Sequence, residues 1–414
     1  MINRMLWFSV VSDAAEAGRQ AWPALRWEAH RWVPSISRGL VSRSVRESHR
    51  GSYRAAVPPA IAGFAPVLSS SALALADEAS IEVARFDGEM GVEIEPFEAV
   101  LLRAESASSS QIENLTSGAK AIALAELGDR ERRNATEIVA NVRAMRAAID
   151  LADRLDGDAI LSMQSALLAD EYPDLTGRWR SQQVWIGGSG FGPHQATFVP
   201  PHADRVAAAM ADLVGFMQRN DIPVLVHAAL AHAQFETIHP FPDGNGRTGR
   251  AIVHAMLRAK GLTRNVTVPV SAGLLTDTEA YFDALTAFRA GEPDAIVMRF
   301  AEASFSAVVN GRQLVSDLHD ARARWQTVIR ARQDSVAWSL VDLLLRHPVI
   351  DAPTAQRELG VTAANTQRAI RRLADAGVIT EFTDRKRNRL WQSIEILSAL
   401  DAFAARAGRR GLTR

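Results

Sequence analysis

Apolar residues recur at helical spacing along most of this chain. Runs with a repeat of three to four residues, each bounded by polar, glycine or proline breaks, predict helices over 69–90, 95–110, 111–127, 132–155, 204–220, 222–238, 246–261, 277–291 and 294–314. The segments 222–238, 246–261 and 277–291 carry the apolar face of a bundle. The pattern predicts a mainly α fold.

Two stretches break this pattern. In 177–201, "GRWRSQQVWIGGSGFGPHQATFVPP", β-favouring residues flank a glycine-rich turn, which is typical of a β-hairpin. Its glycines fit neither the dinucleotide-binding spacing nor the lysine-bearing phosphate loop. Residues 1–50 are rich in arginine and aromatic residues without a clear period, and we expect an N-terminal arm there.

The last part of the chain, about 335–395, has its own order of elements. Three helical segments are followed by "VITEFTDRKRNRLWQ", which is typical of a two-stranded wing, so we predict a small winged helix-turn-helix. From Ser335 to the end there are thirteen basic and eight acidic residues. The excess lies on the third helix and the wing, at Arg368, Arg371, Arg372, Arg385, Lys386, Arg387 and Arg389. DNA is one candidate partner of this module, and protein contact or dimerisation is the other.

Composition narrows the class of protein. The 47 basic and 47 acidic residues cancel, which argues against a surface built throughout for nucleic acid or anionic membrane. There are no cysteines, so a thiolate metal site, a disulfide and a cysteine nucleophile are excluded. No window approaches the ~20 apolar residues that span a bilayer, and acidic residues interrupt the apolar N-terminus before a signal-peptide core develops. These features predict a cytoplasmic protein without a membrane partner.

The richest chemistry lies in "HPFPDGNGRTGR", residues 239–250, between two predicted helices. Two glycines around an asparagine at a helix start let the backbone point several N–H groups outward, and the helix dipole adds positive potential there. Arg247 and Arg250 lie three apart on the first turn of that helix, so both can face one anion. More than one phosphate is therefore the expected ligand of this loop.

Two further residues of the motif supply reactive groups. His239 has an ordinary pKa near ~6.5 and suits a general base. Asp243 is an oxygen ligand beside the expected phosphates, where Mg²⁺ commonly bridges a carboxylate and a polyphosphate. Together these groups describe nucleotidyl transfer. His227 and His232 are five apart on one predicted helix and so point to different faces, which favours a core or surface role over metal binding.

This motif resembles that of the Fic (Fido-domain) family of protein adenylyltransferases at every characteristic position, and the likeness extends over about 53–310. The resemblance implies a Fic-type helical bundle with a β-hairpin flap. It implies ATP as substrate, with His239 deprotonating a Ser, Thr or Tyr hydroxyl of a target protein and Asp243 holding Mg²⁺. It further implies a set of nucleotide-binding residues, namely Gly244, Asn245, Gly246, Arg247, Arg250 and Tyr281, the last beside adenine.

The resemblance also bears on specificity. The hairpin from about Val184 to Pro193 would be the flap that clamps a target segment by backbone pairing, with Val184, Trp185, Ile186 and Gly187 at its start. A relative that works as a kinase has lysine where this chain has Gly246, which disfavours kinase chemistry. Phosphocholine and other nucleotides stay open as transferred groups.

A second resemblance concerns control. "SSQIEN", 109–114, is similar to the family's inhibitory pattern, a Ser or Thr, three residues, then Glu followed by Gly or Asn. Ser109, Glu113 and Asn114 hold these positions. Glu113 would pair with Arg250 and occupy the place of the γ-phosphate. Two alternatives stay open: a transcription regulator whose Fic domain senses a nucleotide, and a reverse reaction in which Glu113 positions water to remove AMP.

These features divide the chain into five parts. They are an N-terminal arm (1–50), a helical Fic-associated domain with the inhibitory helix (51–125), the Fido catalytic domain (126–310), a linker helix (311–334) and the winged helix-turn-helix domain (335–414). The expected partners are target proteins, this chain itself among the candidates. Self-association into a homo-oligomer is left open.

Overall fold

A computed structural model describes residues 21–33, 42, 44, 47, 49–91, 94–383 and 387–408. Helices dominate it, which confirms the predicted mainly α class. The α-helices are α3 (Ser70–Met90), α4 (Ile94–Ile112), α5 (Ala119–Glu126), α6 (Arg133–Asp150), α7 (Gly157–Leu168), α8 (Ala203–Met217), α9 (Val224–Ile238), α10 (Asn245–Ala259), α11 (Val270–Leu275), α12 (Thr278–Ala290), α13 (Asp294–Val328), α14 (Val336–Arg346), α15 (Ala352–Leu359), α16 (Ala363–Asp375) and α17 (Ile394–Gly408).

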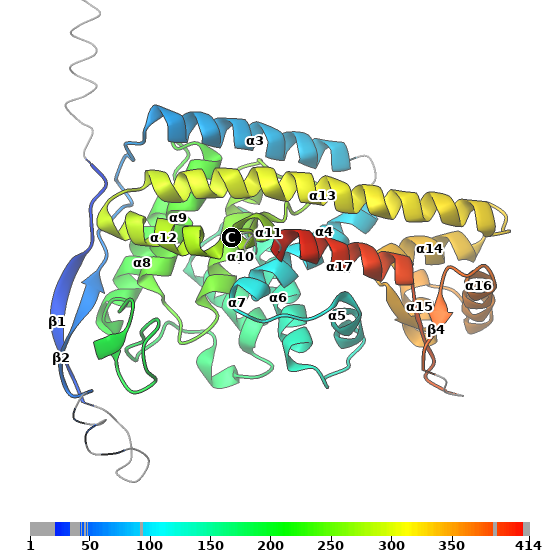
Figure 1. The fold of residues 1–414 in the computed structure, drawn as a ribbon, viewed down its shortest axis with the longest axis horizontal. Helices are drawn as coiled ribbons and strands as arrows, with labels where there is room; N and C mark the ends of the chain where they lie inside the picture. Colours follow the sequence, from blue (N-terminus) through cyan, green and yellow to red (C-terminus); the bar gives the residue numbers. More distant parts are fainter. Residues whose placement is uncertain are drawn as a thin grey trace, which may run out of the picture.

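Two helices run on where the sequence pattern suggested a break. Helix α4 continues past Ser110 to Ile112 and stops just before Asn114, which has a φ of 61°. Asparagine tolerates this left-handed conformation better than most residues, so it ends the helix at low cost. Helix α13 is a single helix of 35 residues that covers most of the expected linker. It lies along α3 on one side of the molecule (Figure 1).

The β structure includes an unpredicted strand in the N-terminal arm and only a short pairing in the expected hairpin. Part of the predicted arm is a strand, β1 (Arg26–Trp32), which pairs antiparallel with β2 (Gly51–Val57) at one end of the molecule (Figure 1). The rest of the arm, 1–20 and most of 34–48, lies outside the described residues. In the expected hairpin, pairing is limited to one bridge between Ile186 and Phe198. The consecutive left-handed Gly187 and Gly188 turn the chain at once, which leaves no length for a ladder.

The C-terminal part contains the predicted order of elements. Helices α14, α15 and α16 are followed by β4 (Thr380–Glu381) and β5 (Leu390–Gln392), and β3 (Val349–Asp351) completes a sheet of order β3-β5-β4. Arg385 and Lys386 lie outside the described residues. The assignment of this part to the winged-helix class stays a prediction.

The sequence pattern had assigned no element to α17, which returns from the last strand to the main bundle. Its buried residues Ile396, Leu400 and Phe403 recur at helical spacing, and the helix packs against α4, α5, α11 and α13. One continuous cluster of buried apolar side chains therefore joins the bundle to the C-terminal elements. The domain boundaries at 310 and 335 stay predictions.

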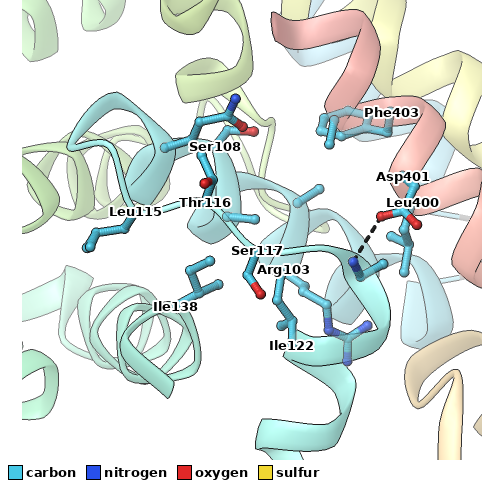
Figure 2. Close-up of a pocket in the computed structure, with 15 residues that line it drawn as sticks. Arg103, Ser108, Leu115, Thr116, Ser117, Ile122, Ile138, Leu400, Asp401 and Phe403 are labelled. Carbon is cyan, nitrogen blue, oxygen red and sulfur yellow. Dashed lines mark hydrogen bonds between the residues drawn. The ribbon is translucent and has the colours of Figure 1, made fainter. Parts of the chain in front are cut away.

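Helix α17 also meets the segment that follows α4. Asp401 Oδ1 accepts a hydrogen bond of 2.9 Å from the N–H of Ala119 and so caps α5, whose own cap residue, Gly118, has no side chain to do it. Such a cap contributes about 0.5–2 kcal/mol. Figure 2 shows this bond beside a cavity between α4, α5 and α17, which Ser108, Leu115 and Phe403 help to line. Over the described residues, no helix is both long and apolar enough to cross a membrane.

Candidate active site

The loop at 239–244 joins two helices of the core. All side chains of α9 from Leu225 to Ile238 are buried, and Phe241 is fully buried with its ring centroid 5.2 Å from that of Trp179. The side chain of Asn245 accepts from the N–H of Phe241 at 2.9 Å and donates to its carbonyl at 2.8 Å. Both polar atoms of Asn245 are thus used to close the loop. The expected phosphate contact of Asn245 would have to come from its backbone.

Gly244 begins helix α10 in a left-handed conformation, with a φ of 81°. A Cβ at this position would lie 2.9 Å from Leu167 Cδ2, so the turn requires glycine for both its conformation and its space. The first N–H groups of α10 have no partner within the helix and point out of its end. A helix start of the kind that can bind an anion therefore lies at the predicted place.

A cleft of about 440 Å³ opens over this helix start. The residues of the motif that line it are His239, Pro242, Asp243, Gly244, Asn245, Gly246 and Arg247, and Glu113, Leu115, Arg133, Asn134 and Glu137 face them. Its volume is within the range of ~300–1,000 Å³ that small-molecule sites occupy. Arg247 lies with one Nη 3.4 Å from Glu137 and the other 3.9 Å from Asp243. The cleft thus holds a cation and an exposed carboxylate side by side.

Arg250 lies under the same helix start and is held from helix α4. Its Nε donates to Ser109 Oγ at 2.8 Å, and its Nη2 donates to the Ser109 carbonyl at 2.7 Å and to Glu113 Oε1 at 2.9 Å. Burial opposes the charge of Arg250, but Glu113, Tyr281 and Glu236 around it raise its pKa above the ordinary value. The predicted pairing of Glu113 with Arg250 is confirmed, and Ser109 takes part in it.

Glu113 also lies directly over the anion-binding helix start. A Cβ added to Gly246 would come within 1.9 Å of Glu113 Oε1 and 3.0 Å of an Arg250 Nη. Only a glycine at 246 therefore admits the carboxylate in this position. Negative charge is favoured at a helix N-terminus, so Glu113 gains from the same field that would attract a phosphate.

His239 ends helix α9 in a left-handed conformation, with a φ of 50° and its N–H bonded to Phe235. Its side chain is 19% exposed, and Nδ1 lies 3.8 Å from Glu236 Oε2, beyond hydrogen-bond distance. Burial, and then the charges of Arg180 and Arg289, lower the pKa of His239 to about 3. The imidazole is therefore neutral near neutral pH, which is the form a general base needs.

A polar cluster that the sequence analysis did not identify lies beneath the cleft. Tyr281 is 1% exposed and shares a hydrogen bond of 2.7 Å between its hydroxyl and His232 Nε2. Burial raises the pKa of Glu236, beside Arg250, to about 7. The expected contact of Tyr281 with adenine stays a prediction, and in this structure the ring does not line the cleft. In the sequence, only the polar residues His232 and Glu236 within the otherwise apolar helix α9 indicated this cluster.

The two histidines considered as metal ligands are both core residues. His227 Nε2 lies 2.8 Å from the Phe216 carbonyl, and His232 bonds Tyr281. Among the described residues, no group of three or more His, Cys, Asp or Glu side chains is placed to hold a metal ion. Mg²⁺ in nucleotide sites is usually held by one or two carboxylates together with substrate phosphates. The single carboxylate of Asp243, 57% exposed beside the anion site, fits that kind of binding.

The predicted flap packs beside the β1–β2 sheet. The Trp185 ring lies 5.3 Å from that of Trp32, and the N–H of Ala56 donates to the Val199 carbonyl at 3.0 Å. Val184, Trp185, Ile186 and Gly187 are not among the residues that line the cleft. Strand β1, which was not predicted from the sequence, thus contacts the flap segment through Trp32.

Four shifted pKa values predict how stability depends on pH. The pKa values of His227, His232 and His239 are lowered to about 4, 3 and 3. As pH falls below about 6.5 the unfolded chain binds these protons and the folded chain does not, so the free energy of unfolding decreases. Glu236, whose pKa is raised, acts in the opposite direction between about 4.5 and 7, because the folded state keeps its proton there.

Glu236→Gln is therefore expected to make the loss of stability with acid steeper, by up to about 1.4 kcal/mol per pH unit. Urea unfolding of both proteins at several pH values from about 5 to 6.5 measures this slope. An equal or shallower slope in the variant would contradict the role given to Glu236.

Known proteins are similar to part of this chain in sequence and to its fold. Residues 154–257 match the model of the Fic/DOC family. The chain is 28% identical over 171 residues to protein adenylyltransferase fic-1 of Caenorhabditis elegans. The aligned segment covers 40% of this chain and 31% of that protein. It is 32% identical over 108 residues to protein adenylyltransferase Fic of Nematostella vectensis, covering 25% and 23%. The chain thus spans less than a third of the length of these curated relatives.

A solved structure extends the likeness beyond the matched segment. A Fic family protein from Desulfovibrio desulfuricans G20 aligns with a TM-score of 0.50 and 23% identity, over 79% of this chain and 97% of that one. At this identity the match shows a shared fold. Because residues of the 239–250 motif line one cleft and residues 154–257 match the Fic/DOC family, we conclude that this chain contains a Fic domain.

Proposed function

We propose that this chain is a self-inhibited protein adenylyltransferase, which transfers AMP from ATP to a Ser, Thr or Tyr hydroxyl of a target protein. The observation that carries the proposal is that His239, Arg247 and the start of α10 face one cleft, with Glu113 and Arg250 paired at its edge. A neutral imidazole beside an anion site suits proton removal during attack on a phosphate. The curated relatives named above are adenylyltransferases, which supports the same chemistry here.

In the proposed reaction, His239 acts as the general base. Its Nδ1 faces Glu236, so Nε2 is the nitrogen that takes the proton of the target hydroxyl. The hydroxyl oxygen forms a bond to the α-phosphorus, the bond from that phosphorus to the bridging oxygen breaks, and pyrophosphate leaves. Arg247 and the first N–H groups of α10 would hold the β-phosphate, and Arg250 would hold the γ-phosphate.

Mg²⁺, where it binds with the nucleotide, supplies neutralisation of the phosphate charges. Asp243 is the residue that would hold it, because its carboxylate is exposed beside the anion site. The present pairing of Arg247 with Glu137 and Asp243 would give way to contacts with the nucleotide. The segment 184–187 would bind the target by backbone pairing, as a flap.

Glu113 would restrain this reaction in the basal state. Its carboxylate neutralises Arg250 and covers Gly246, both of which the nucleotide needs. ATP would then bind, if at all, with its γ-phosphate displaced, which would leave the α-phosphorus poorly aligned for attack.

The Glu113→Gly variant, incubated with ATP and Mg²⁺ alone and in lysate, tests the proposed chemistry. Mass spectrometry should find an adduct of one AMP on the protein itself or on a target. A modified protein that loses AMP on incubation with Mg²⁺ would favour the reverse reaction. Nucleotide binding with no covalent label in either direction would favour the sensor alternative.

DNA binding by the C-terminal module is a second proposed activity, and the exposed arginines of α16 favour it. Arg368, Arg371 and Arg372, with Arg330, surround a hollow on one face. Helix α16 would enter the major groove, as the third helix of a winged helix does. The full chain is expected to shift a DNA duplex with an affinity that falls as salt rises, and the shift should weaken in Arg371→Ala. Binding that is independent of salt, or no shift, would favour a protein partner.

A further inference from the structure

Arg180 is a buried cation without an acidic partner. Its side chain is 4% exposed, and among the described residues no carboxylate forms an ion pair with it. Burial lowers its pKa to about 10, so it stays charged at neutral pH. Burying an unpaired charge is costly unless hydrogen bonds satisfy it. This buried guanidinium group lies just before the predicted flap. It belongs neither to the 239–250 motif nor to the groups that act in the proposed reaction.

All hydrogen-bond partners of Arg180 are backbone carbonyls, and they belong to three separate segments. Nε donates to His239 at 2.8 Å, Nη1 to Gln182 at 2.9 Å and Nη2 to Pro201 at 2.6 Å. The backbone N–H of Arg180 also donates to the Pro240 carbonyl at 2.9 Å. One planar group therefore joins the end of helix α9 to both ends of the flap segment.

His239 needs such support because of its backbone. A left-handed conformation at a residue other than glycine is strained by about 1–2 kcal/mol and persists only when its surroundings hold it. Arg180 holds the two peptide groups that follow His239, one through the His239 carbonyl and the next through the Pro240 carbonyl. The direction of the imidazole depends on the backbone that these two bonds hold.

We infer that Arg180 is a positioning residue, which fixes His239 at a set distance from the flap and so aligns the base with the hydroxyl of a bound target. The inference rests on the proposed adenylyl transfer. Three donors pointing in three directions from one plane are a property of the guanidinium group, and a lysine ammonium does not reproduce it. Charge alone is therefore not sufficient at this position.

The test compares Arg180→Lys and Arg180→Ala in the Glu113→Gly protein, with labelled ATP as the probe and self-labelling or lysate labelling as the readout. Misplacement of a catalytic group by about 1 Å can lower a rate ~10²-fold, and we expect a loss of that order in both variants. ATP affinity should be unchanged, because no atom of Arg180 lines the cleft. Millimolar guanidinium should restore part of the activity of Arg180→Ala, which a general loss of folding would not allow.

Arg178→Ala is the matched control. This neighbouring arginine is exposed and its Nη2 donates to the Asp174 carbonyl, away from the base and the flap. It should label at the parent rate. If Arg180→Lys also labels at the parent rate, or if ATP binding falls together with labelling and guanidinium restores neither, the inference is wrong. If the Glu113→Gly parent itself transfers no AMP, the proposed function has failed instead.

Discussion

Replacing Glu113 by glycine is expected to raise the initial rate of AMP transfer by about ten- to a hundredfold. A hydrogen bond to a charged group contributes ~1.5–3 kcal/mol, and the bond from Arg250 to Glu113 is of this kind, at 2.9 Å. Its loss frees one N–H of Arg250 Nη2 and uncovers the start of α10 above Gly246. The two Ser109 bonds would still orient Arg250, so the released site should bind the γ-phosphate without rearrangement.

The measurement is incorporation of labelled AMP against time at saturating ATP. Gln111→Gly is the matched control, since it places glycine in the last turn of α4, two residues before Glu113, and leaves the carboxylate intact. Any activation caused by loosening the helix would appear in both variants. Equal rates in wild type and Glu113→Gly, or equal activation in Gln111→Gly, would remove the inhibitory role of Glu113.

His239→Ala is expected to lower transfer by at least about 10²–10⁴-fold, to the background of the assay, because general base catalysis contributes rate factors of that size. The experiment uses the Glu113→Gly protein, in which the starting rate is highest. ATP binding should stay measurable by calorimetry, because the proposed phosphate contacts come from Arg247, Arg250 and the start of α10. His239 contributes only one wall of the cleft.

His202→Ala serves as the control for loss of a histidine. Its ring stacks on His30 at 4.3 Å and does not line the cleft, so transfer should continue at the parent rate. Undiminished transfer in His239→Ala would show that another group removes the proton.

Part of the site could be predicted because its chemistry is local in the chain. The motif 239–250 places an anion-binding turn, two arginines and a carboxylate within twelve residues, and their roles follow from a helix start. The left-handed Gly244 and the buried Phe241 lie as such a turn requires. The pairing of Glu113 with Arg250 spans 137 positions, and only the resemblance to a family pattern indicated it.

Other parts of the site depend on residues that carry no motif. In the sequence, nothing distinguishes Arg180 from the many other arginines. That it contacts three separate backbone segments is known only from the structure. Glu236 and His232 lie in an apolar helix, and their burial beside Arg250 follows from packing. The extent of strand pairing in the flap segment could not be predicted, because β propensity does not reveal how early a glycine pair turns the chain.

The sequence by itself therefore determined the helical class, the glycine turn at the start of α10 and the residues proposed as reactive groups, because these depend on spacing within one or two helical turns. Only the tertiary structure decided which distant groups surround them. It placed Glu113 over Gly246, buried Arg180 behind His239 and returned α17 onto α4, the helix that ends one residue before Glu113. The physical reason is that burial and hydrogen-bond partners depend on how whole helices pack, and the free energy of that packing is spread over many apolar contacts that no short motif records.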